Sequence, residues 1–227
     1  MIQVLARVPI ARLARSPRAW LPIAAWSALA ILVAITARQS PSGGADQALL
    51  GGFGSFAVPL VAFAVVSAAL AGNGLKEAIR PVVALGGSPS RVALATVLTA
   101  MFASAALTGV LGALVVAIVG SSHFGADLAA TVWIAALGGA CYAAWFSFAA
   151  TFGVRGTGRA TFLIVDYLFG TSSGGNASTL AFFTPRGNLH SLLGGAAPND
   201  ISQRASSLAL VLITAVCVLL AVRRART

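Results

Sequence analysis

Apolar runs separated by short polar segments are the feature that most restricts how this chain can fold. A transmembrane helix needs roughly 20 apolar residues. Hydrophobic residues make up 58% of the 227 residues and charged residues only 9%, more apolar surface than a soluble domain could bury. We therefore predict an all-α membrane protein, with one transmembrane domain over residues 1–227. The six predicted spans are residues 19–37, 49–71, 89–119, 128–152, 159–170 and 201–222.

The fifth of these runs, residues 159–170, is short of the roughly 20 residues that a crossing needs. The segment that follows, residues 171–199, is polar and glycine-rich with apolar islands. Irregular backbone is tolerated in a bilayer only where neighbouring protein shelters it. We therefore predict a re-entrant outer hairpin between spans five and six. It should contain short helices at about residues 177–183 and 185–193, the second with proline at its first position.

The distribution of basic residues predicts the orientation. The chain has 15 Lys and Arg against five Asp and Glu, a net charge of +10. Twelve of the 15 lie in the N-terminal segment, the 72–91 connection, the 153–159 turn and the C-terminus, which leaves three for the other side. Basic loops tend to remain in the cytoplasm. We predict a multi-pass protein of the bacterial cytoplasmic membrane with both termini inside, and no nucleic-acid partner.

Residues 2–16 form the first of two amphipathic segments. On a helical wheel Arg7, Arg12 and Arg15 gather on one side, opposite a group of apolar residues. That group consists of Ile2, Leu5, Ile10 and Leu13. We predict an interfacial helix that leads into the first span. A disordered basic tail is the alternative.

The connection between spans two and three, residues 72–91, is longer and more basic than a turn requires. It reads GNGLKEAIRPVVALGGSPSR and has room for a short helix at residues 75–85 along the membrane surface. Its apolar residues recur at spacings of three and four, so they would share one side of that helix. They are Leu75, Ile79, Val82 and Val83, with Lys76, Glu77 and Arg80 largely on the other side. Such a helix would let a soluble partner push on the membrane domain; a solvated loop is the alternative.

Motifs that carry chemistry are missing from the sequence. It contains no Walker-A pattern, no H-E-x-x-H and no C-x-x-C, so we expect no enzyme activity and no cofactor in this chain. Serines in residues 170–174 precede His190, but all lie in one outer loop, which disfavours a membrane serine protease. Asp166 lies inside the fifth run, where an ionisable residue is a candidate for translocation or for an interface. A structural partner for backbone or hydroxyl groups is the alternative.

With this organisation the chain resembles the membrane domain of type-2 ABC exporters. In that family an interfacial helix precedes six spans, a coupling helix joins spans two and three, and a re-entrant outer hairpin joins spans five and six. Residues 2–16, 75–85 and 171–199 occupy these three places in order. The family's loose pattern of an acidic residue, Leu, Pro and Arg can be laid on Glu77, Leu85, Pro89 and Arg91.

The resemblance implies the permease subunit of an ATP-driven exporter. Two copies of a separate ABC ATPase would hold ATP and Mg²⁺, and a second copy of this or a similar permease would complete the transporter among the membrane lipids. The implied coupling residues are Leu75, Lys76, Glu77, Ile79, Arg80, Val82 and Val83. The apolar side of their helix would fill a groove on the ATPase. A stand-alone secondary carrier that uses Asp166 and a non-transporting membrane accessory subunit are the alternatives.

Overall fold

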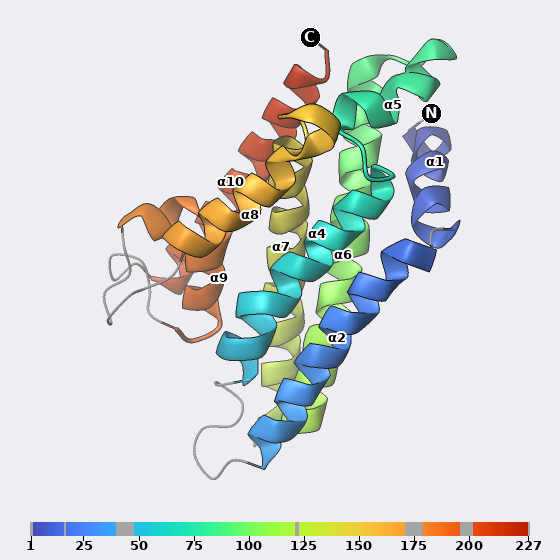
Figure 1. The fold of residues 1–227 in the computed structure, drawn as a ribbon. Helices are drawn as coiled ribbons and strands as arrows, with labels where there is room; N and C mark the ends of the chain where they lie inside the picture. The colour runs from blue at the N-terminus through green and yellow to red at the C-terminus, as the bar shows by residue number, and fades with distance from the viewer. Residues whose placement is uncertain are drawn as a thin grey trace.

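The computed structural model describes residues 2–15, 17–39, 48–120, 123–170, 179–195 and 202–226. Every regular element within these ranges is a helix. In chain order they are α1 (Ile2–Arg15), α2 (Pro17–Arg38), η1 (Ala48–Ala57), α4 (Val58–Ala69), α5 (Leu75–Ala84), α6 (Pro89–Val119), α7 (Phe124–Ala149), η2 (Val154–Gly156), α8 (Gly158–Phe169), η3 (Thr179–Phe183), α9 (Pro185–Leu192) and α10 (Gln203–Arg224). Figure 1 shows a bundle of long helices, with α5 across one end and α8 and α9 along one side.

Among the described residues, five helical segments are long and apolar enough to cross a membrane. They are Trp20–Arg38, Ala48–Ala69, Pro89–Val119, Phe124–Ala149 and Gln203–Arg224. These segments match the first four predicted spans and the sixth. The fifth predicted span is α8, a helix of only 12 residues. The chain is thus an all-α, multi-pass membrane protein.

The basic segments gather at one end of the bundle. Figure 1 shows the N-terminus, α5, the start of α8 and the C-terminus at that end, while α2 ends at the opposite one. The guanidinium of Arg224, near the C-terminus, lies 4.0 Å from the centroid of the Phe152 ring, which follows α7. The four segments that hold most of the basic residues therefore lie on the same side, as the charge count predicts. The first of them is a helix, α1, and not a disordered tail.

Helices α6 and α7 pack closely along a stripe of small residues. The stripe on α6 consists of Ala100, Ser104, Thr108 and Gly112, all buried. A Cβ on Gly139 of α7 would lie 2.2 Å from Thr108 Oγ1, so no side chain fits there. The Thr108 hydroxyl donates a hydrogen bond to Ala135 O across the helix pair at 2.8 Å. The four-residue spacing of small side chains thus allows close approach of the two helices.

The second span does not begin as an α-helix. Its first ten residues form the π-helix η1, and α4 continues from Val58. A Cβ on Gly52 would lie 2.7 Å from Val33 Cγ1 of α2, and one on Gly54 would lie 2.4 Å from Leu193 Cδ1 beside α9. Glycine therefore lets two neighbouring segments pack directly on η1. π-Helices are rare and occur frequently at functional sites.

Two short helices, η3 and α9, follow α8 close to where the sequence predicts them. The Thr184 hydroxyl caps α9 by accepting the N–H of Gly187 at 3.3 Å, and Gly194 turns the chain away with a φ of +93°. Most of α9 is buried although several of its side chains are polar, so neighbouring helices shelter them. Residues 171–178 and 196–199 of the predicted outer hairpin lie outside the described residues.

Candidate functional site

The predicted surface helix between the second and third spans is present as α5. Leu75 and Ile79 are buried and belong to the same apolar core as residues of α4, α6 and α7. Val82 and Val83 are partly buried against that core. The segment is therefore a packed helix and not a solvated loop.

This packing corrects the prediction that the apolar side of α5 fills a groove on a partner protein. Leu75 and Ile79 face the bundle of their own chain, where almost none of their surface is exposed. A spacing of three and four identifies an apolar face but not the surface that covers it. The nearest apolar surface to a ten-residue helix between two spans is the bundle that those spans form. The apolar residues of α5 therefore anchor the helix.

The opposite side of α5 is exposed and charged. Lys76, Glu77 and Arg80 all lie on this side. Leu85, the residue directly after the helix, has 89% of its surface exposed. We define the outward face of α5 as the exposed residues Lys76, Glu77, Arg80 and Leu85.

Hydrogen bonds from α1 and α7 hold α5 in place. Both terminal nitrogens of Arg12, on α1, donate to Ala78 O at 3.1 Å. Directly after α7, Ala150 O accepts the N–H of Leu75, the first residue of α5, at 3.1 Å. Helices distant in the sequence are thus joined through α5.

A third attachment comes from Arg159, which is buried at the start of α8. Its Nε donates to Gly156 O and its Nη2 to Gly72 O, both at 3.1 Å. The two loops also touch directly, because a Cβ on Gly156 would lie only 3.0 Å from the Cα of Gly74. The α4–α5 connection and the α7–α8 turn therefore form one packed unit.

Asp166 lies two turns further along α8 and is fully buried. Its Oδ2 accepts the hydroxyl of Tyr142, on α7, at 2.8 Å. Its Oδ1 accepts the backbone N–H of Arg186, in the first turn of α9, at 3.1 Å. The carboxylate thus joins three helices. It faces the interior of the bundle, as the cost of placing a charge in lipid predicts.

The backbone carbonyl of Ser55, on η1, is the second junction in this region. It accepts the hydroxyl of Tyr167 at 2.7 Å and Arg186 Nη1 at 3.1 Å. Pro59, four residues further on, has no N–H to donate to this carbonyl. The carbonyl is therefore available to side chains. The Arg186 guanidinium also lies 4.0 Å from the centroid of the Tyr167 ring.

The Ser55 hydroxyl contacts His190 of α9, with 2.8 Å between Oγ and Nε2. The hydroxyl donates its single proton to Leu50 O at 2.6 Å, so His190 Nε2 is the donor in the contact with Ser55. In this arrangement the histidine is not a base for the serine. The serines of residues 170–174, considered above as partners of His190, lie outside the described residues.

We call this group the outer polar cluster, after the predicted outer hairpin beside it. It consists of Ser55, Tyr142, Asp166, Tyr167, Arg186 and His190. Sequence reasoning singled out Asp166 and His190 but missed the other four. Two features of the sequence point to this cluster. Pro59 has no N–H to donate to the Ser55 carbonyl, and Arg186 is a basic residue on the side of the membrane that is predicted to hold few basic residues. Nowhere in the described ranges do three His, Cys, Asp or Glu side chains come close enough together to hold a metal ion.

Comparisons of the chain with models of protein families, with curated protein sequences and with solved structures found no match. The class of this protein therefore follows from its helices alone: it is an all-α, multi-pass membrane protein.

Proposed function

We propose that this chain is the membrane-spanning permease subunit of an ATP-driven ABC exporter in the bacterial cytoplasmic membrane. A separate ATPase subunit, present in two copies, would dock at α5, and a second copy of this or a similar permease would complete the transporter. The observation that carries the proposal is α5 itself. It lies across the end of the bundle (Figure 1), is tied to α1, α7 and α8, and turns a charged face outward.

The two sides of α5 have separate roles in this proposal. Leu75, Ile79, Val82 and Val83 hold the helix on the bundle, and its outward face meets the ATPase. A push on that face passes through Arg159 to α8. The Arg159 guanidinium donates to Gly72 O in the α4–α5 connection and to Gly156 O in the turn before α8, so it links these two loops. Helix α8 then carries the movement to Asp166 and the outer polar cluster.

The proposed topology has six crossings with both termini in the cytoplasm. At 1.5 Å per residue α8 rises about 18 Å, well short of a hydrocarbon core of about 30 Å. The fifth crossing, α8, would therefore stop short of the outer surface, and η3 and α9 would lie in a re-entrant outer hairpin between the fifth and sixth crossings. The burial of Thr184, Arg186 and Asn188 supports this arrangement, since such groups must be sheltered from lipid.

A stand-alone secondary carrier is the second candidate, because Asp166 is a buried carboxylate hydrogen-bonded to a tyrosine. Such a carrier would couple transport to a proton gradient through Asp166 and would need no ATPase. Dissipating the gradient with an ionophore while ATP is maintained separates the two candidates. Transport by the exporter should continue, whereas transport by the carrier should stop.

The direct test is purification of the tagged chain from its native membrane in mild detergent. A Walker-A ATPase should co-purify with the wild-type chain. The double variant Lys76→Glu/Arg80→Glu should lower its recovery at least tenfold and leave the melting temperature of the permease unchanged, because both side chains are exposed. Arg38→Glu, a charge reversal at the opposite end of the bundle, is the matched control and should keep the ATPase.

The proposal fails if no ATPase accompanies the wild-type chain, or if the double variant retains as much ATPase as the control. Ile79 is unsuitable for this test. A charge at that buried position would disturb the fold and could not report on docking alone.

A further inference from the structure

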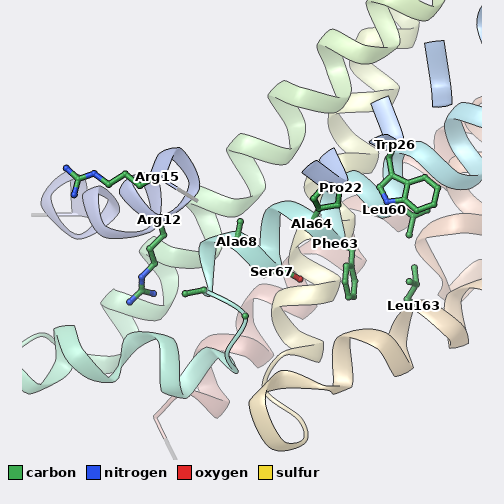
Figure 2. Close-up of a pocket in the computed structure, with 12 residues that line it drawn as sticks. Arg12, Arg15, Pro22, Trp26, Leu60, Phe63, Ala64, Ser67, Ala68 and Leu163 are labelled. Carbon is green, nitrogen blue, oxygen red and sulfur yellow. The ribbon is translucent and has the colours of Figure 1, made fainter. Parts of the chain in front are cut away.

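A cavity of about 680 Å³ lies between α1, α2, α4 and α8. Its volume falls within the range of about 300–1,000 Å³ that small-molecule sites occupy. Figure 2 shows Arg12 and Arg15 of α1 at one end, with both guanidinium groups directed away from the apolar side chains, among them Trp26 and Leu163, at the other end. The cavity is therefore amphipathic, with its charged groups confined to one end.

One face of α4 forms the floor of this cavity. The α4 residues and their continuation that line it recur at spacings of three and four. They are Leu60, Phe63, Ala64, Ser67, Ala68 and Ala71. At 1.5 Å per residue this face is about 17 Å long, close to the roughly 15 Å of hydrocarbon in one leaflet of a bilayer.

The charged end of the cavity suits an anion. Arg15 is exposed, and Arg12 uses two of the five N–H donors of a guanidinium on Ala78 O, which leaves donors for a second partner. This is also the end of the bundle where the basic segments of the chain gather (Figure 1). Anionic lipid headgroups attract arginines near a membrane surface.

The geometry points to a binding site for an anionic phospholipid, with one acyl chain along α4 between α2 and α8 and the phosphate at Arg15 and Arg12. A peptide fits less well, because its backbone N–H and C=O groups need partners. Among the lining residues beyond the arginines, only Ser67 and Trp26 carry a polar side-chain group. This inference does not depend on the proposed transport function.

The first test titrates the purified full chain with phosphatidylglycerol and with phosphatidylcholine of the same acyl chains, and bound lipid is counted by native mass spectrometry. Phosphatidylglycerol should bind more tightly to the wild type. Arg15→Gln should weaken its binding about fivefold, the factor expected for one arginine near an anionic headgroup, and weaken the binding of phosphatidylcholine less, because the choline cation of that lipid offsets the charge of its phosphate. Arg7→Gln is the control, since Arg7 is exposed on the same helix and does not line the cavity.

The second test fills the groove. Ser67→Phe places a ring on its floor and should weaken the binding of both lipids at least tenfold, whereas Ala106→Phe, at an exposed position on α6, should not. Three results would each overturn the inference: equal binding of the two lipids to the wild type, equal losses for Arg7→Gln and Arg15→Gln, or unchanged binding to a folded Ser67→Phe variant. If Ser67→Phe does not fold, the comparison of Arg15→Gln with Arg7→Gln still tests the inference.

Discussion

The Arg12 attachment of α5 and the outer polar cluster use similar hydrogen bonds in very different surroundings. In both regions an arginine donates to a backbone carbonyl: Arg12 to Ala78 O beside α5, and Arg186 to Ser55 O in the cluster. Arg12 is half-buried at the end of the bundle, whereas Arg186 is buried among helices. A carbonyl or guanidinium that loses its partner near the end of the bundle can bond to water instead. Inside the bundle it cannot.

The loss of a hydrogen bond therefore has different consequences in the two regions. An unsatisfied buried polar group incurs the full penalty of its lost hydration, while an exposed one loses only the modest net value of the bond. We therefore expect the outer polar cluster to determine the stability of the fold. The half-buried attachment through Arg12 should instead determine how firmly α5 follows the bundle.

Asp166→Ala should have the largest effect. It removes the acceptor of Tyr142 and of the Arg186 N–H, and it leaves two donors buried without partners. We expect a loss of about 3 kcal/mol or more in the free energy of unfolding, measured from the melting temperature of the purified chain. Asp166→Asn keeps one acceptor oxygen and should lose less than half as much. If Asp166→Ala melts at the wild-type temperature, the cluster does not hold the outer helices together.

Arg159→Gln should have an intermediate effect. It removes the bonds to Gly72 O and Gly156 O from a buried position and should cost about 2 kcal/mol. The clearer readout is hydrogen exchange, which should accelerate in the amides of α5 and of its N-terminal connection. Arg155→Gln, an exposed change in the same turn, is the control. Equal exchange in the two variants would contradict a link between these loops.

Arg12→Gln should have the smallest effect, about 1 kcal/mol, because the guanidinium is only half-buried. Amide exchange in α5 should accelerate, with little change in the melting temperature. Arg159 is buried as Arg186 is, so losses of equal size for Arg12→Gln and Arg159→Gln would remove the distinction between half-buried and buried arginines. Arg7→Gln, on the same helix but outside this contact, should match the wild type.

The sequence predicts the position of most helices because their signals are local. Runs of hydropathy locate five long helices, Gly74 and the residues after it locate α5, and proline at position 185 locates the start of α9. Which surface covers the apolar face of α5 depends on tertiary packing and not on the local sequence. The prediction that a partner protein covers this face was wrong, because the bundle of the same chain buries Leu75 and Ile79. The contact of Ser55 with His190 joins residues 135 positions apart, and it depends on how η1 and α9 pack together.

The uneven lengths of the helices have a consequence for the surrounding bilayer. At 1.5 Å per residue the 31 residues of α6 extend about 46 Å, while the 12 residues of α8 extend about 18 Å. Where Ile164 and Leu168 of α8 are exposed, the protein therefore presents a shorter apolar helix than it does along α6. A short apolar stretch is matched by local thinning of the bilayer at a modest cost, so we expect thinner lipid beside α8 than beside α6.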